Sequence, residues 1–151
     1  MIFSVDVRIE APVRDTEVTD RVDDAVANLF PDVDLHHEPG TLVAESHSLD
    51  RFSDVLHEQE ILDTARQEFR DGVDRRDDGD DPGFDFRLKK QAAYEGVVNF
   101  AVGSEDELGD IAVDVTVREP SVEEFIDHVA PPTEEGTPVD PEADREEFDR
   151  R

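Results

Sequence analysis

The stretch Phe3-Ser4-Val5-Asp6-Val7-Arg8-Ile9-Glu10-Ala11 alternates apolar and polar side chains along its whole length. A period of two is typical of a β-strand that buries one face and leaves the other in water. The same alternation returns in 84–88 and in 111–118. Strands that bury only one face are typical of antiparallel sheets, so these three segments predict such a sheet.

Three other segments follow the period of a helix. Residues 18–30 place their apolar side chains on one helical face. A longer helical pattern runs over 48–72, with a break expected near 57–60 because Gln59 falls on the apolar side. A last short helix is expected to begin at the capping box of 121–124.

Shorter strand patterns complete the predicted sheet. The segments 33–35 and 42–44 flank a Pro39-Gly40 turn and predict a β-hairpin. Residues 94–102 predict another strand, in which Gly96 indicates a bulge. Strands and helices are mixed without strict alternation. This order predicts the α+β class: one mostly antiparallel sheet with helices packed on one face, and the other face free to meet a partner.

The length of the chain, 151 residues, is enough for one domain with a core of its own. We expect this single α+β domain to span 1–130 and to carry an acidic polar loop at 74–83. Beyond residue 130 the chain is rich in Pro, Glu and Asp and poor in apolar residues. Such a composition predicts an acidic disordered tail over 131–151.

The charge balance indicates the environment of the protein. The chain has 42 Asp and Glu against 15 Lys and Arg, a formal net charge of -27. Self-repulsion at this charge destabilises a compact state in dilute buffer, whereas at about 1 M ionic strength the Debye length falls to roughly 3 Å. We therefore expect a halophilic cytosol. The alternative is a mesophilic acidic protein that binds basic partners.

Several classes of protein are disfavoured by what the sequence lacks. It contains no cysteine, so disulfides and thiolate chemistry are excluded. No stretch approaches the roughly 20 apolar residues of a membrane span, and no basic leader precedes the first strand, so a cytoplasmic protein without membrane contact is expected. The five histidines have no metal-ligand spacing, and no catalytic or cofactor fingerprint occurs. We expect no metal, no cofactor, no catalytic residue and no enzymatic activity.

The strongest functional signal is the acid-free stretch 86–94, which contains the two lysines of the chain, Lys89 and Lys90. If Phe86 and its apolar neighbours face the core, Arg87 and Lys89 point outward and can reach phosphates. In this interpretation Gln91 hydrogen-bonds a base edge or sugar, Tyr94 stacks on a base and Arg8 joins from the first strand. The alternative is a strand whose cations pair with surrounding acids.

Four sequence blocks also carry a resemblance. They are Arg8-Ile9-Glu10-Ala11-Pro12-Val13, Asn28-Leu29-Phe30-Pro31-Asp32, Ile61-Leu62-Asp63-Thr64-Ala65-Arg66, and Lys90-Gln91-Ala92-Ala93-Tyr94 followed by Gly96 and Val98-Asn99-Phe100. Over roughly 2–130 the chain resembles a small archaeal family known as Uncharacterised Protein Family 0201, whose members are predicted RNA-binding proteins. The fold of that family is similar to that of the large-subunit ribosomal protein that contacts the smaller ribosomal RNA.

The resemblance implies an archaeal cytosol, an α+β fold and RNA, with ribosomal RNA as one candidate, as the partner. It implies no catalytic residue. By position, Arg66, Lys90, Gln91 and Asn99 match recurrent polar residues of the family. Together with the strand pattern this gives a predicted RNA-binding set of Arg8, Arg66, Arg87, Lys89, Lys90, Gln91, Tyr94 and Asn99.

Two alternatives remain open at this point. The first is a protein-interaction adaptor, or a homodimer, that docks another chain on its open sheet face. The second is an enzyme on a small metabolite, built on the polar residues Asp63, Arg66, Gln91 and Asn99.

Overall fold

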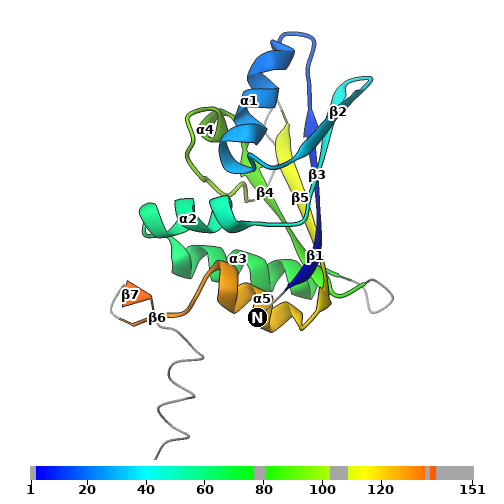
Figure 1. Cartoon of the computed structure of the whole chain (residues 1–151). Coiled ribbons are helices and arrows are strands. Elements are labelled where there is room, and N and C mark those ends of the chain that lie inside the picture. Colours follow the sequence, from blue (N-terminus) through cyan, green and yellow to red (C-terminus); the bar gives the residue numbers. More distant parts are fainter. Residues whose placement is uncertain (1–2, 77–80, 103–108, 135–136, 139–151) are drawn as a thin grey trace, which may run out of the picture.

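The computed structural model describes residues 3–76, 81–102, 109–134 and 137–138 (Figure 1). Five strands form one antiparallel sheet in the order β2-β3-β1-β5-β4. These strands are β1 (Ser4–Pro12), β2 (Asp34–Glu38), β3 (Thr41–Ser46), β4 (Gly83–Lys89) and β5 (Asp110–Glu119). The helices are α1 (Thr19–Leu29), α2 (Asp50–Glu58), α3 (Leu62–Arg75), α4 (Lys90–Tyr94) and α5 (Val122–Val129).

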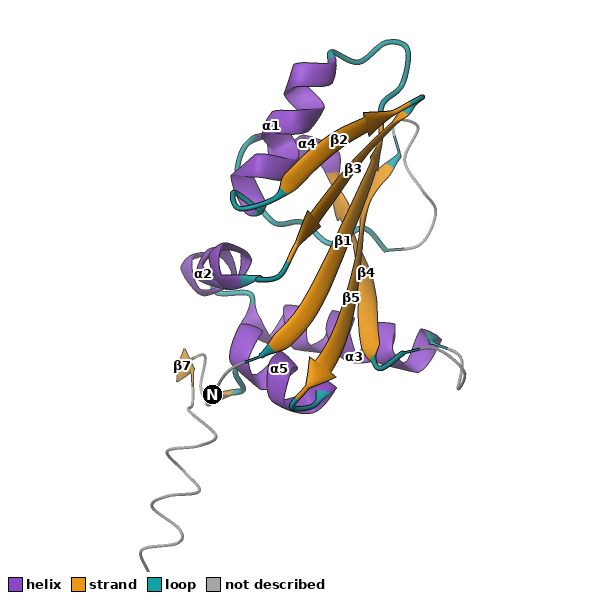
Figure 2. Cartoon of the chain, turned by 45° about the vertical axis from the view of Figure 1, so that its right-hand side comes forward, coloured by secondary structure: helices purple, strands orange, loops and turns teal. Residues whose placement is uncertain are grey.

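All five of these helices lie on one face of the sheet (Figures 1 and 2). Helices α1 and α4 cover one end of the sheet, and α3 and α5 cover the other (Figure 1). Within the described residues no helix covers the second face. The predicted α+β architecture with helices on one face is therefore confirmed. None of the described helices combines the length and the apolar character needed to cross a bilayer.

The central strand is β1, which pairs with β3 on one side and β5 on the other. Its alternation places Val5, Val7, Ile9 and Ala11 against the helices, and none of the four is more than 4% exposed. The intervening polar side chains face away from the core. This explains why the first strand pattern is so regular: the strand has core on one face only and neighbours on both edges.

A cluster of aromatic rings fills the space between the sheet and the helices. Phe52 of α2 is fully buried, and its ring centroid lies 5.4 Å from that of Phe30 and 5.3 Å from that of Phe86. The rings of Phe69 and Phe100 each lie 6.4 Å from it. Phe52 thus joins α1, α2, α3 and β4 in one core.

The long helical pattern is divided as expected, since α2 ends at Glu58 and α3 begins at Leu62. Between them Glu60 adopts a positive φ of 57°. The Gln59 side chain donates to Val98 O at 3.0 Å and accepts from Val98 N at 2.7 Å. The polar residue on the apolar face therefore has a structural role, because it fixes the segment that returns to β4.

The expected end of α3 near Gly72 is wrong, because the helix continues to Arg75. A Cβ atom on Gly72 would lie 2.2 Å from the backbone oxygen of Asp85. Gly72 therefore allows the helix backbone to approach β4 closely, and does not end the helix. The loop expected at 74–83 is correspondingly shorter, and residues 77–80 of it lie outside the described residues.

The expected strand over 94–102 is also wrong. Residues 90–94 form the short helix α4, and Gly96 turns the chain with a φ of 78°. Strand-like pairing is limited to an isolated bridge between Phe100 and Leu88, at the outer edge of β4. The Ala92-Ala93 pair is compatible with a helix, and this local preference prevails until the chain reaches Gly96.

Two further predictions concern smaller elements. The hairpin is confirmed, since β2 and β3 pair around Gly40. The predicted helix cap at Ser121 is confirmed, since Ser121 Oγ accepts from Glu124 N at 3.2 Å, while the Glu124 carboxylate accepts from Ser121 Oγ at 3.1 Å. In the expected tail, β6 (Thr133–Glu134) pairs with β7 (Thr137–Pro138). Disorder of the tail stays a prediction, because 139–151 lie outside the described residues.

Candidate nucleic-acid surface

Most arginines of the described chain are neutralised by carboxylates of the same molecule. The arginines that form such ion pairs are Arg8, Arg51, Arg66, Arg70, Arg75, Arg76, Arg87 and Arg118. A carboxylate beside a guanidinium offsets its positive charge and repels an approaching phosphate. The arginines in ion pairs are therefore poor candidates for an RNA contact.

The open sheet face is dominated by acids. One row of paired residues crosses all five strands and consists of Asp34, Glu45, Arg8, Asp114 and Asp85. Arg8 Nε donates to Glu10 at 3.0 Å, and Glu45 lies 3.5 Å from the same guanidinium. The hydrogen bond from Arg8 to Glu10 and the nearby carboxylates raise the pKa of Arg8 above its ordinary value. The sheet face that was predicted to be cationic thus carries an excess of carboxylates along this row.

Arg87 and Arg118, on the same sheet face, are also paired with carboxylates. Arg87 Nη1 donates to Asp110 Oδ2 at 3.1 Å, and the Asp110 side chain is only 2% exposed. Arg118 pairs with Asp6. The alternative interpretation, in which the cations pair with surrounding acids, therefore holds for Arg87 on β4 and also for Arg8 on β1.

Lys90 is placed in the interior. Its side chain is 7% exposed, and Nζ donates to Glu17 Oε1 at 2.9 Å and to Pro12 O. Glu17 also accepts from Arg14 N at 2.9 Å. The Lys90 ammonium therefore joins α4 to the β1–α1 connection, and it does not reach the molecular surface, where an RNA contact was expected.

Arg66 lies at the other end of the sheet. Its side chain is 13% exposed, and Nη1 donates to Asp127 Oδ1 at 2.8 Å and to Ala130 O at 2.7 Å. These bonds hold α5 against α3. The four residues of the suggested metabolite site are not brought together, because Asp63 and Arg66 lie on α3 whereas Gln91 and Asn99 lie near α4.

Three cations of the described chain have no carboxylate partner among the described residues: Arg14, Arg21 and Lys89. Arg14 follows β1, Arg21 lies on α1, and Lys89 is the last residue of β4. All three belong to the end of the sheet where α1 packs on α4 (Figure 1). These three cations thus share one end of the sheet, with Arg21 on its helical side and Lys89 on its open face.

The tyrosine of the chain lies in the same region. Tyr94 is 44% exposed, and Cζ of Arg21 lies 5.9 Å from the centre of its ring. The Asn28 side chain donates to Ala93 O at 3.1 Å and to Tyr94 O at 2.9 Å, which fixes the end of α4 against α1. The aromatic ring is therefore held at the surface beside a cation.

Two exposed amides complete the region. Gln91 lies three residues before Tyr94 on α4, so both side chains lie on one side of the helix. Lys89 N donates to Asn99 O at 2.9 Å, next to the Leu88–Phe100 bridge, so Asn99 lies opposite Lys89. We call the set Arg21, Lys89, Gln91, Tyr94 and Asn99 the α1–α4 corner.

Sequence reasoning found four residues of the α1–α4 corner but missed Arg21. Arg21 occupies a polar position of an amphipathic helix, and no sequence signal sets it apart from the other exposed residues of that helix. Its role depends on which helix packs beside Tyr94, which is a tertiary contact. Asn28, which binds the end of α4, was not among the predicted site residues, although it belongs to one of the recognised sequence blocks.

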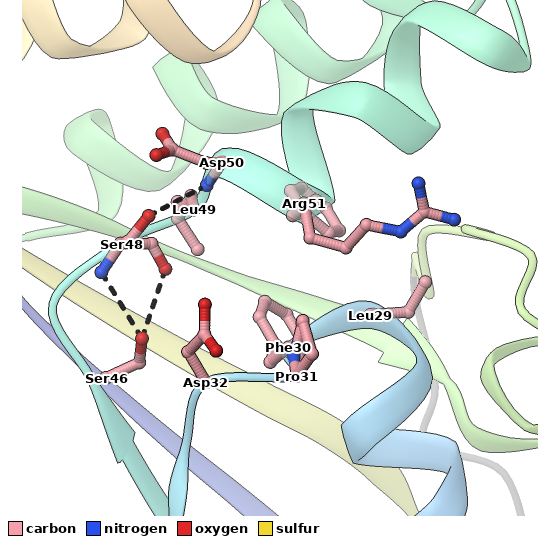
Figure 3. A pocket seen from close by; sticks show the side chains of 10 residues that line it. Leu29, Phe30, Pro31, Asp32, Ser46, Ser48, Leu49, Asp50 and Arg51 are labelled. Carbon is pink, nitrogen blue, oxygen red and sulfur yellow. Dashed lines mark hydrogen bonds between the residues drawn. The ribbon is translucent and has the colours of Figure 1, made fainter.

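A small pocket lies between the end of α1, the end of β3 and the start of α2 (Figure 3). Its hydroxyls are already bonded: Ser46 Oγ donates to Ser48 O at 3.2 Å, and Ser48 Oγ accepts from Asp50 N at 3.1 Å. Asp32 and Asp50 contribute carboxylates to the lining. Across the described residues no group of three or more His, Asp and Glu is arranged to hold a metal ion. The pocket indicates no reaction.

The fold and the α1–α4 corner define a small α+β protein with an open antiparallel sheet and a localised polar and aromatic surface. The model of a family described as RNA binding matches residues 6–118. The chain is 41% identical over 138 residues to a UPF0201 protein of Methanopyrus kandleri, covering 82% of this chain and 83% of that protein. The chain belongs to the UPF0201 family of archaeal proteins.

Two further relatives define the extent of the similarity. A UPF0200/UPF0201 protein of Archaeoglobus fulgidus is 34% identical over 140 residues; the match covers 90% of this chain but only 40% of that longer protein. The crystal structure of the UPF0201 protein from Methanococcus jannaschii superposes with a TM-score of 0.78 at 30% identity, covering 89% of this chain and 98% of that chain. The family assignment and the fold are thus supported independently.

Proposed function

We propose that this chain is a non-enzymatic protein that binds RNA through the α1–α4 corner. The observation that carries the proposal is the concentration, in one region, of exposed amides, an exposed aromatic ring and cations without a carboxylate partner among the described residues. The RNA-binding description of the family supports the class of ligand. The proposal replaces the predicted sheet-face site by one centred on α4, which keeps Lys89, Gln91, Tyr94 and Asn99 and adds Arg21.

The mode of binding follows from the charge. A net charge of -27 repels phosphates at long range, so Coulomb attraction cannot supply most of the affinity. If Arg14, Arg21 and Lys89 each contact one phosphate, the logarithm of affinity falls with the logarithm of salt with a slope of only about −2 on a single strand. Stacking and hydrogen bonds then carry the specificity, which suits binding to ribosomal or other structured RNA in a salt-rich cytosol.

A triple variant tests the location of the site. Arg21→Ala/Lys89→Ala/Tyr94→Ala is expected to weaken RNA binding at least about tenfold in about 2 M KCl, since the stacking of one base is worth about 1 to 3 kcal/mol. The measurement is fluorescence anisotropy with a labelled RNA recovered from the native complex. Arg51→Ala/Arg70→Ala removes the same number of positive charges from exposed, paired positions and should bind as the unmodified protein does. Equal losses in both variants would place the site elsewhere.

The proposed salt-rich environment makes a prediction about folding. Transfer from about 2 M to about 0.1 M KCl lengthens the Debye length from about 2 Å to about 10 Å and restores repulsion between the carboxylates. We expect a lower melting temperature and partial loss of helical circular dichroism, both recovered when KCl is returned. A melting temperature that does not change between the two salt concentrations would contradict a halophilic protein.

A second candidate function is docking of another protein chain, including a second copy, on the sheet. One observation favours it: all five residues of the edge strand β2 are exposed, and among the described residues its outer edge is unpaired. Charged and histidine side chains dominate this strand, which opposes pairing of two copies. The molar mass in solution, measured by light scattering in about 2 M KCl, separates docking of a different protein from docking of a second copy. A monomer would rule out the homodimer.

A further inference from the structure

We infer that the α1–α4 corner binds an unpaired RNA nucleotide whose base stacks on the ring of Tyr94 while the amides of Gln91 and Asn99 contact polar groups of the RNA. This inference rests on the proposed function and specifies the class of RNA. It excludes a continuous duplex as the preferred ligand. Three properties of the α1–α4 corner lead to it: the exposed ring, the free amides and the small number of available cations.

The ring of Tyr94 is suited to a planar partner. The residue is 44% exposed, although it belongs to a helix that packs on α1. Arg21 lies over the ring at 5.9 Å, near the outer limit of about 6 Å for an effective cation–π contact. Arg21 has no carboxylate partner among the described residues, so we expect it to turn to a phosphate when a base occupies the ring. Bases within a duplex are already stacked on their neighbours, so only an unpaired base can use this ring.

The two amides offer donors and acceptors together. The side chains of Gln91 and Asn99 are exposed and make no hydrogen bond within the described residues. Each amide can donate and accept, which suits the base edges and the 2′-hydroxyl of RNA. Gln91 lies on the side of α4 that carries Tyr94, and Asn99 lies opposite Lys89. A nucleotide stacked on Tyr94 would thus have the Gln91 amide on its own side of α4, whereas Asn99 lies beside Lys89 at the outer edge of β4.

The charge distribution disfavours a duplex. Recognition of double-stranded RNA relies on shape and on phosphate and 2′-hydroxyl contacts along successive grooves. Of the cations that the structure describes, only Arg14, Arg21 and Lys89 lack a carboxylate partner among the described residues. The neighbouring sheet face presents the acidic row of Asp34, Glu45, Asp114 and Asp85 around Arg8. A long rigid duplex would bring phosphates toward these acids, whereas a single unpaired nucleotide would not.

The composition of the chain provides a direct probe of stacking. Tyr94 is the single tyrosine, and the chain has no tryptophan, so its tyrosine emission comes from this one ring. The full chain is titrated in about 2 M KCl with a short unlabelled RNA of mixed sequence and, separately, with the same RNA annealed to its complement. Free tyrosine at equal absorbance corrects for light absorbed by the RNA.

The inference predicts that the single strand quenches Tyr94 emission in a saturable way and that the duplex binds at least about tenfold more weakly. With a labelled RNA, Tyr94→Leu should lower affinity by about 5- to 150-fold, and Tyr94→Phe should retain it. Saturable binding with no change in emission, or equal binding of duplex and single strand, would overturn the inference and leave the proposed function standing. No binding of either RNA would overturn both.

Discussion

Replacing Lys90 by Met is expected to lower the free energy of unfolding by about 3 kcal/mol. Replacing its neighbour Lys89 by Met should change the free energy of unfolding by less than about 0.5 kcal/mol. The Lys90 ammonium lies between Glu17 and Pro12 O with a side chain only 7% exposed. Its removal leaves the Glu17 carboxylate, itself 12% exposed, without its cation. Lys89 has no such partner among the described residues. Urea unfolding in about 2 M KCl measures both values.

The physical reason for the Lys90 effect can be tested in the same protein. Lys90→Met/Glu17→Gln removes both charges while the amide oxygen of Gln can still accept from Arg14 N. Removal of both members of a buried pair costs much less than removal of one, so the double variant should recover most of the lost stability. A Lys90→Met protein as stable as Lys89→Met would contradict a stabilising role of the Lys90–Glu17 ion pair.

The second large effect is expected at Phe52. Phe52→Ala should destabilise the protein by about 4 kcal/mol, because truncation of a fully buried phenylalanine removes its transfer free energy and leaves a cavity. The cavity would adjoin the rings of Phe30, Phe69, Phe86 and Phe100. Urea unfolding monitored by circular dichroism gives the value.

Two controls make the Phe52 result specific. Phe52→Leu keeps most of the apolar volume and should cost clearly less than Phe52→Ala. Tyr94→Ala removes a ring that is 44% exposed and should have a small effect on stability. A loss below about 1 kcal/mol for Phe52→Ala would mean that this ring does not join the helices to the sheet.

The parts of the fold that sequence predicts well are those in which one physical rule acts alone. The strands that contain Ile9, Phe86 and Val113 face the core on one side only, so polarity alternates and the pattern is unambiguous. Gly72 misleads as a helix end because a glycine signals either a turn or a close approach, and only the tertiary contact with Asp85 separates the two. The segment 94–102 misleads because apolar residues around Gly96 fit a strand as well as a turn.

The two lysines illustrate what limits prediction of the site. Lys89 and Lys90 are neighbours in sequence, yet Lys89 points out of β4 and Lys90 points inward at the start of α4. The alternation of Phe86, Leu88 and Lys90 already carries this signal, since every second residue of the strand faces the core. Arg21 cannot be found in this way, because its proximity to Tyr94 depends on the packing of α1 against α4.

Photo-crosslinking distinguishes RNA contact at the α1–α4 corner from RNA contact on the open sheet face. The purified full chain is irradiated with RNA containing 4-thiouridine in about 2 M KCl, and the crosslinked peptides are identified by mass spectrometry. We predict crosslinks within α4 at Tyr94 and in the flanking residues Lys89 and Asn99, with none in the strands around Arg8. Crosslinks concentrated on β1, β3 and β5, with α4 unmodified, would refute binding at the corner.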